Sequence, residues 1–242
     1  MKLLRFGEKG KEKPAMLDDE GNIRDLSSVV PDIAGGILAD MSWQADLDVE
    51  NLRIVDPNTR IGACVGGIGK VIGIGLNYSD HAEEAGMEVP SEPIVFMKAT
   101  SSVCGPNDPI IIPRGSKQTD WEVELGVVIG RGGKYISEDE ALDHVAGYCL
   151  INDVSEREFQ IHRQGTWDKG KSADNFCPIG PWLVTADEFG DPQDKDMYLT
   201  VNGQSMQKGN TATMVYNVRY LVSYLSNFMT LQPGDVIATG TP

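Results

Sequence analysis

The stretch from Asp120 to Gly130, DWEVELGVVIG, constrains the fold most strongly. Its second half is apolar and rich in β-formers, which predicts a strand. Side chains alternate between the faces of a strand, so Asp120, Glu122 and Glu124 share one face. Three like charges in a row repel one another and are costly on an otherwise apolar strand unless a cation lies near. Arginine or lysine partners could supply that charge, and a divalent cation would accept several carboxylate oxygens at once.

Other patterns predict a chain in which strands dominate. Further strands are expected over residues 70–76, 93–99, 108–113 and 148–153. Helices are expected over residues 77–84, 137–147, 155–165 and 217–229. Two of these carry a capping box, from Ser137 with Glu140 and from Ser155 with Glu158, and Gly147 would cap the first at its carboxyl end.

A glycine-rich stretch, residues 66–69, marks the expected domain boundary. Residues 1–66 contain short strands and turns and predict a small N-terminal β domain. Residues 67–242 would form the main domain. The chain stops on a turn-like GTP directly after a strand, so this domain is expected to be truncated after Pro242.

Charge and cysteine usage limit the partners and the compartment. The net charge of −15 repels phosphate backbones and anionic lipid, so neither nucleic acid nor a membrane is an expected partner. Lys70 and several glycines interrupt the most apolar window, residues 64–76. No secretory signal is visible, and the scattered cysteines fit reduced, buried thiols, which predicts a cytoplasmic protein. These cysteines are Cys64, Cys104, Cys149 and Cys177.

Two groups of residues could carry chemistry. Asp153 is expected at a strand-to-helix corner, where it could join Glu122 and Glu124 as the third carboxylate of a Mg²⁺ or Mn²⁺ site, with Asp120 outside the ligand set. His81 has Glu84 three residues later on the expected helix, and a carboxylate beside an imidazole suits a general base.

The remaining candidates divide into lysines, histidines and glycines. Lys98, at the end of a buried strand, and Lys171, expected in a loop, could neutralise a substrate carboxylate or enolate, although structural roles fit them equally well. His144 and His162 look like helix-surface residues without a role. The glycines of residues 66–75 have the wrong spacing for a dinucleotide-binding loop, and they precede a strand instead of following one.

Six ordered segments then form a recognisable pattern: NYSDHAEE, PIVFMK, DWEVELGVVIG, INDVSERE, WDKGKS and LQPGDVIATGTP. Over residues 70–242 the chain resembles the fumarylacetoacetate hydrolase family. The resemblance implies an α+β, mostly β fold, a mixed β-roll behind a small N-terminal β domain, usually in a homodimer. It also implies that Glu122, Glu124 and Asp153 bind Mg²⁺, or Mn²⁺ or Ca²⁺.

The same resemblance implies the roles of the other residues. His81, partnered by Glu84, and Lys171 are the expected catalytic residues. The expected contacts of a small oxo acid substrate are Tyr78, Lys98, Gly240 and Thr241.

The reaction that follows is hydrolysis of an acylpyruvate to pyruvate and a carboxylic acid. His81 would take a proton from the attacking water, and Lys171 would help to stabilise the pyruvate enolate that leaves. A 2,4-diketo-3-deoxy sugar acid and fumarylpyruvate are the candidate substrates. Ureidoglycolate cleavage, and decarboxylation or isomerisation of a β-keto acid, are alternatives on the same metal site. A metal-binding family member without turnover is an alternative of another class.

Overall fold

The computed structural model describes residues 1–242 except residues 85 and 87. Most strands belong to one mixed sheet, in the order β3-β2-β1-β11-β9-β8-β14-β4-β5, with β6 paired to β11. Its strands are β1 Lys2–Phe6, β2 Lys13–Leu17, β3 Ile23–Asp25, β4 Val71–Gly75, β5 Ile94–Lys98, β6 Val103–Cys104, β8 Val123–Ile129, β9 Val145–Asn152, β11 Cys177–Thr185 and β14 Val236–Ala238. Two short antiparallel pairs complete the strands, β7 Thr119–Asp120 with β10 Ser155–Glu156 and β12 Asp196–Val201 with β13 Gln204–Asn210. This mostly β architecture confirms the predicted fold class.

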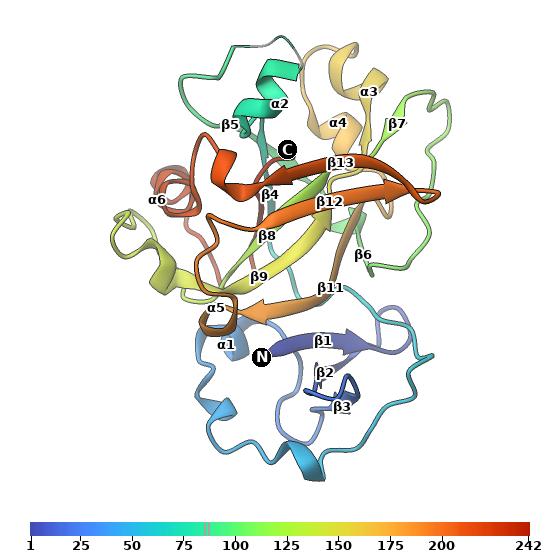
Figure 1. Cartoon of the computed structure of the whole chain (residues 1–242), viewed down its shortest axis with the longest axis vertical. Coiled ribbons are helices and arrows are strands. Elements are labelled where there is room, and N and C mark those ends of the chain that lie inside the picture. Colours follow the sequence, from blue (N-terminus) through green and yellow to red (C-terminus); the bar gives the residue numbers. More distant parts are fainter. Residues whose placement is uncertain (85, 87) are drawn as a thin grey trace.

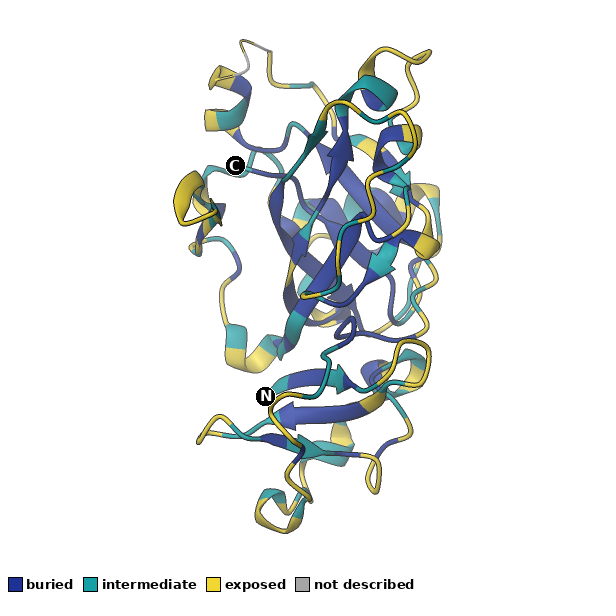
Figure 2. Cartoon of the chain, turned by 90° about the vertical axis from the view of Figure 1, so that its right-hand side faces the viewer, coloured by how far each residue is buried: buried dark blue, intermediate teal, exposed yellow. Residues whose placement is uncertain are grey.

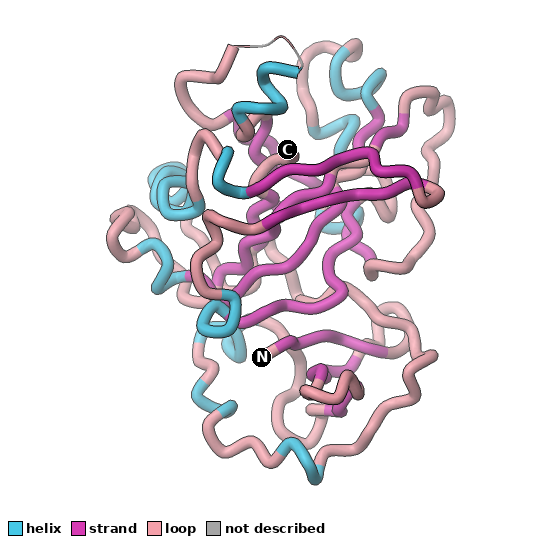
Figure 3. Tube along the Cα trace, viewed as in Figure 1, coloured by secondary structure: helices cyan, strands magenta, loops and turns pink. Residues whose placement is uncertain are grey.

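Helices are short and lie at the periphery of the sheet (Figure 3). They are α1 Gly35–Ala39, α2 Ser79–Glu84, α3 Arg157–Ile161, α4 Asp168–Lys171, α5 Ala186–Phe189 and α6 Val218–Phe228. Single 3₁₀ turns cover Ser42–Gln44, Val49–Asn51, Thr100–Ser102, Ala141–His144 and Thr211–Thr213. Among the described residues, every helix is too short or too polar to cross a lipid bilayer.

The central strands carry most of the buried residues, while loops and helix ends are exposed (Figure 2). One core cluster joins N-terminal residues such as Leu3 and Leu26 to Cys149 and Ile179 of the central strands. A second lies under α6, whose buried residues follow the helical spacing that the sequence predicted. Asn217 caps this helix by accepting a hydrogen bond from the backbone N–H of Tyr220.

The N-terminal strands lie at one end of the long axis, and α2, α3 and α4 lie at the other (Figure 1). β1 pairs antiparallel with β11, through Lys2 with Val184 and Leu3 with Leu183, so the N-terminal strands extend the same sheet. The domain division at residue 66 stays a prediction.

Two predicted elements are wrong. Residues 108–113 form no strand: Pro109 and Pro113 have no N–H to donate to a ladder, and Ile111 and Ile112 are exposed. Residues 137–147 form no α-helix, although Ser137 and Glu140 make their capping-box contact.

Pairing with distant strands overrides the local helix signal of residues 137–147. β9 begins at Val145, opposite Ile129 of β8, so Gly147 lies inside a strand. A Cβ on Gly147 would come within 2.2 Å of the Val184 carbonyl oxygen, so this glycine allows two strands to approach instead of ending a helix. His144 is correspondingly buried, with its Nδ1 2.7 Å from the Arg131 carbonyl oxygen, and does not lie on a helix surface as predicted.

The helix expected over residues 155–165 is shorter than predicted. Ser155 belongs to β10, and α3 begins at Arg157. The N-cap is Glu156, whose side chain accepts a hydrogen bond from the Glu158 backbone N–H. The cap was misassigned because Ser155 pairs with Asp120 of β7, a contact between residues far apart in the sequence.

Candidate metal and catalytic site

Antiparallel pairing of β8 with β9 brings three acids together. Val123 pairs with Asn152, so the start of β8 lies beside the end of β9. Glu122 and Glu124 flank Val123, and Asp153 follows Asn152 and donates its backbone N–H to the Glu122 carbonyl oxygen at 2.9 Å. All three acids are buried. One carboxylate oxygen from each acid lies within 4.8 Å of the corresponding oxygens of the other two. Such a group of hard oxygen donors fits a divalent cation.

Cationic side chains contact two of these acids. The Lys171 ammonium lies 2.7 Å from Glu122 Oε2 and 2.7 Å from Asp153 Oδ2. Lys98 donates to the other oxygen of Asp153 at 2.5 Å and to the Val154 carbonyl at 3.2 Å. Both lysines are buried, and their opposite charges remove most of the cost of burying the acids. Lys171 belongs to the short helix α4, not to the loop that the sequence predicted, because residues 168–171 pack on α3 and β5.

The three acids differ in how their charge is stabilised. Burial, reinforced by the nearby charges of Asp153 and Glu122, raises the pKa of Glu124 well above its usual value. Burial also opposes ionisation of Asp153, but Lys98 and Lys171 outweigh it and hold the pKa of Asp153 below its usual value. Glu124 is therefore the acid with the most to gain from a further cation.

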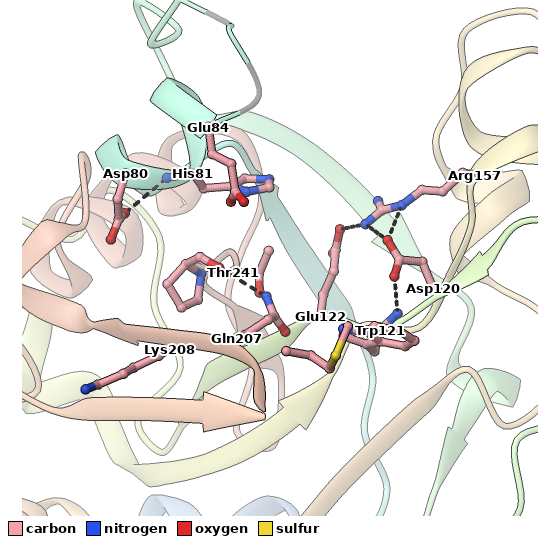
Figure 4. A pocket seen from close by; sticks show the side chains of 12 residues that line it. Asp80, His81, Glu84, Asp120, Trp121, Glu122, Arg157, Gln207, Lys208 and Thr241 are labelled. Carbon is pink, nitrogen blue, oxygen red and sulfur yellow. Dashed lines mark hydrogen bonds and ion pairs between the residues drawn. The ribbon is translucent and has the colours of Figure 1, made fainter. Parts of the chain in front are cut away.

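Arg157 was missed by the sequence reasoning. Its guanidinium lies 2.6 Å from Glu122 Oε1 and 2.8 Å from Asp120 Oδ2, so it joins the acid outside the cluster to one inside it (Figure 4). Asp120 belongs to β7 and not to the strand predicted to carry all three acids, and its cationic partner is an arginine. No local pattern in the sequence indicates these contacts, because Asp120 and Glu122 lie more than thirty residues before Arg157.

The segment after β14 closes one side of the cluster. Gly240 donates its N–H to Glu124 Oε2 at 2.9 Å, and Thr241 donates its hydroxyl to the Val123 carbonyl at 2.8 Å. Gly240 has a φ of 96°, a conformation that favours glycine. Gln207, from β13, accepts a hydrogen bond from the Val123 N–H and donates to Thr241 Oγ1. Gln207 had no local sequence signal, because β13 is far from β8 in the chain.

Two adjoining cavities open onto the cluster, with volumes of about 360 Å³ and about 460 Å³. Both are lined by His81, Glu122, Arg157 and Thr241. Glu84 lines the smaller cavity, and Glu124 and Lys171 line the larger. Glu122 and Glu124 are therefore buried in the fold but face space that a small molecule can enter.

His81 lies on α2 and points toward the smaller cavity, beside Glu84 (Figure 4). No hydrogen bond joins the two side chains in the part of the chain that the structure describes. Their predicted catalytic roles stay predictions. Of the predicted substrate contacts, Thr241 lines both cavities, whereas the side chain of Tyr78 is fully buried in the core cluster under α6.

Comparison with known proteins places this site in a family. The model of the fumarylacetoacetate (FAA) hydrolase C-terminal domain matches residues 70–242. A protein of Burkholderia multivorans, named provisionally as a hydrolase, is 63% identical over 244 residues, which cover 100% of this chain and 86% of the relative. The chain belongs to the fumarylacetoacetate hydrolase family and is an enzyme of that family.

Solved structures of similar proteins show the same fold. The fumarylacetoacetate hydrolase of Exiguobacterium antarcticum matches with a TM-score of 0.88 at 35% identity, over 100% of this chain and 87% of that one. The 5-carboxymethyl-2-hydroxymuconate delta-isomerase of Mycobacterium smegmatis matches with a TM-score of 0.80 at 33% identity, over 100% of this chain and 88% of that one. The maleylpyruvate hydrolase of Sphingobium sp. SYK-6 was solved with manganese(II) and pyruvate. It matches with a TM-score of 0.84 at 28% identity, over 100% of this chain and 89% of that one.

Proposed function

We propose that this enzyme hydrolyses the C–C bond of an acylpyruvate, giving pyruvate and a carboxylic acid. A divalent ion, Mg²⁺ by preference with Mn²⁺ or Ca²⁺ as alternatives, would be held by Glu122, Glu124 and Asp153. The observation that carries the proposal is the buried acidic cluster with a lysine ammonium 2.7 Å from two of its members, beside a cavity. The maleylpyruvate hydrolase solved with manganese(II) and pyruvate supports it.

The charges of the site suit an anionic substrate. Three buried carboxylates face three cationic side chains, those of Lys98, Lys171 and Arg157. A divalent cation would therefore leave positive charge in excess, which the carboxylate of an acylpyruvate and its developing enolate can neutralise. When bound, the ion supplies a Lewis acid that polarises the substrate oxygens.

The residues of this chain would move the protons. His81 takes a proton from a water molecule, which attacks the 4-carbonyl carbon of the substrate. The C3–C4 bond then breaks, and its electron pair forms the enolate of pyruvate. Lys171 donates a hydrogen bond to that enolate, whose charge appears only as the bond breaks. The protonated His81 then returns its proton, which adds to C3, and pyruvate leaves with the carboxylic acid.

The experiment that tests the proposal measures pyruvate release from a panel of acylpyruvates. The panel contains acetylpyruvate, fumarylpyruvate and a 2,4-diketo-3-deoxy sugar acid, each with Mg²⁺ and then with EDTA. We expect loss of the enol absorbance together with pyruvate formation, abolished by EDTA and restored by Mg²⁺ or Mn²⁺. If none of the compounds released pyruvate while the enzyme had metal bound, the proposal would be refuted.

A second candidate is isomerisation or decarboxylation of a related oxo acid, favoured by the similarity to the delta-isomerase. These reactions pass through an enolate but need no attacking water. His81→Ala separates the two: hydrolysis should fall by about 100-fold or more without its general base. Full turnover by His81→Ala would favour the second candidate.

A further inference from the structure

The larger of the two cavities has an apolar wall beside the charged cluster. Leu76, Phe96, Ile161 and Trp167 line it, and the same cavity reaches Glu124 and Lys171. The Lys171 ammonium lies 4.9 Å from the centre of the Phe96 ring, so the aromatic wall begins where the charged cluster ends. A molecule held at the cluster would therefore extend along this wall.

Two glycines of β4 make room for the aromatic rings. Gly73 and Gly75 point to the same face of the strand, because side-chain positions alternate. A Cβ on Gly73 would lie 2.2 Å from the Phe96 ring, and one on Gly75 would lie 2.2 Å from the Trp167 ring. The two rings pair with each other at a centroid distance of 5.5 Å. Gly73 and Gly75 of this strand thus leave room for an aromatic wall.

Backbone strain is retained at the same wall. Leu76 has a φ of 51°, in the left-handed region that bulky residues rarely adopt. Such a conformation is unfavourable and persists only where the surrounding structure enforces it. The strained residue is one of the apolar residues that line the cavity.

The charges around the cavities disfavour a second carboxylate on the substrate. The two cations of the larger cavity, Lys171 and Arg157, are already paired with acids. The lining of the smaller cavity has four acids, against which stand the cations Arg157 and Lys208 and the imidazole of His81; the acids are Asp80, Glu84, Asp120 and Glu122. A carboxylate that lay along the apolar wall of the larger cavity would lose its water, and the two cations in the lining of that cavity already pair with acids.

We propose that the apolar wall binds the acyl group of the substrate and selects an uncharged, apolar acyl chain. The inference rests on the proposed acylpyruvate hydrolysis and adds to it the chemical class of the substrate. It disfavours acylpyruvates whose acyl group carries a second carboxylate, such as fumarylpyruvate or the maleylpyruvate in the name of the Sphingobium relative. Leu76, Phe96, Ile161 and Trp167 are then the residues that determine specificity.

The test compares the binding of two oxo acids that cannot be cleaved as acylpyruvates. 2-Oxohexanoate and 2-oxoadipate have the same chain length, and the second ends in a carboxylate. With Mn²⁺ present, we expect 2-oxohexanoate to bind about tenfold more tightly by calorimetry, since its end group gains from burial and a carboxylate does not. Pyruvate release from acetylpyruvate is measured on the same preparation.

Ile161→Lys is the variant that should change this preference. Ile161 is 58% exposed, so the substitution should leave the fold intact, and the new cation should lower the ratio of the two affinities about tenfold. Ile112→Lys is the matched control, because Ile112 is also 58% exposed but lies in residues 108–113, away from both cavities. The control should keep the native ratio.

The outcomes separate this inference from the proposed function. Equal or tighter binding of 2-oxoadipate by the native protein, an unchanged ratio in Ile161→Lys, or no complex with 2-oxohexanoate would each overturn the apolar specificity. Continued pyruvate release from acetylpyruvate would then leave the hydrolase proposal standing. Absence of both binding and pyruvate release would refute the two together.

Discussion

Asp153 and Glu156 are two buried acids only three residues apart, and their surroundings differ in kind. Glu156 accepts hydrogen bonds from Ser116, from the Thr119 hydroxyl at 3.0 Å and from the Gln118 backbone N–H at 3.0 Å. Burial opposes its ionisation, but these bonds prevail and lower the pKa of Glu156. Neutral donors from residues 116–119 satisfy the hydrogen-bonding capacity of the Glu156 carboxylate. The carboxylate thereby holds this segment against β10 and α3.

Asp153 instead faces Glu122 and Glu124, and these two acids line a cavity. Its charge is balanced by the ammonium groups of the buried side chains of Lys98 and Lys171. The comparison teaches how to distinguish two kinds of buried acid. Neutral hydrogen-bond donors around a buried acid indicate a structural role. Acids that face one another and are balanced by charged side chains indicate a binding site.

The largest expected effect comes from Glu124→Gln. This variant should bind Mn²⁺ at least about 100-fold more weakly by calorimetry, because one of three charged ligands is lost. The metal-free protein should unfold at an unchanged or higher temperature, since a neutral amide avoids repulsion from the other acids while still accepting the Gly240 N–H. Native-like Mn²⁺ affinity would contradict the assignment of the cluster as a metal site.

Lys171→Met should separate binding from turnover. We expect kcat for acetylpyruvate to fall about 100-fold, the usual loss when a donor to a developing oxyanion is removed. Mn²⁺ affinity should stay the same or increase, because a competing cation leaves Glu122 and Asp153. Lys169→Met is the control, since Lys169 is exposed on the same short helix. Equal kcat values for the two variants would remove Lys171 from the mechanism.

Glu156→Gln should affect stability alone. The amide cannot accept all the hydrogen bonds that reach the carboxylate, so the free energy of unfolding should fall by about 2 kcal/mol in urea titrations. The Mn²⁺ dissociation constant of the folded protein should equal that of the native enzyme. A large loss of metal affinity in this variant would contradict the distinction between a structural acid, Glu156, and a binding-site acid, Asp153.

The pH dependence of metal binding should follow Glu124, whose pKa is raised. Below that raised value the acid holds a proton that the metal must displace, so Mn²⁺ affinity should rise with pH, by at most about tenfold per pH unit, and then level off. The stability of the metal-free protein should change in the opposite direction. It should fall as pH rises from the ordinary glutamate pKa of 4.5 toward the raised one, because the folded state loses a proton that it held more tightly. A metal affinity independent of pH across this window would contradict the shift.

Local patterns in the sequence predicted the elements that carry their own signal. The strand around Glu122 and Glu124, the strand that ends before Asp153 and the helix over residues 218–228 all follow from periodicity. The acidic cluster could be predicted from these strands, because acids at the ends of two neighbouring strands lie close together.

Elements and contacts set by distant pairing could not be predicted from local patterns. The helix signal of residues 137–147 gave way to pairing between β9 and β8. Arg157 contacts Asp120 and Glu122, more than thirty residues away, and Gln207 reaches Thr241 across 34 positions. The spacing of the carboxylates in the chain says nothing about these partners, because the pairing of the strands brings them together.

The most direct test of the account is a crystal structure of the enzyme grown with Mn²⁺, with the anomalous signal of manganese used to find the ion. We predict one peak among Glu122, Glu124 and Asp153, bonded to an oxygen of each, with the Lys171 ammonium displaced from its position between two of them. A peak elsewhere, or no peak with Lys171 still contacting both Glu122 and Asp153, would contradict the metal site on which the proposed function depends.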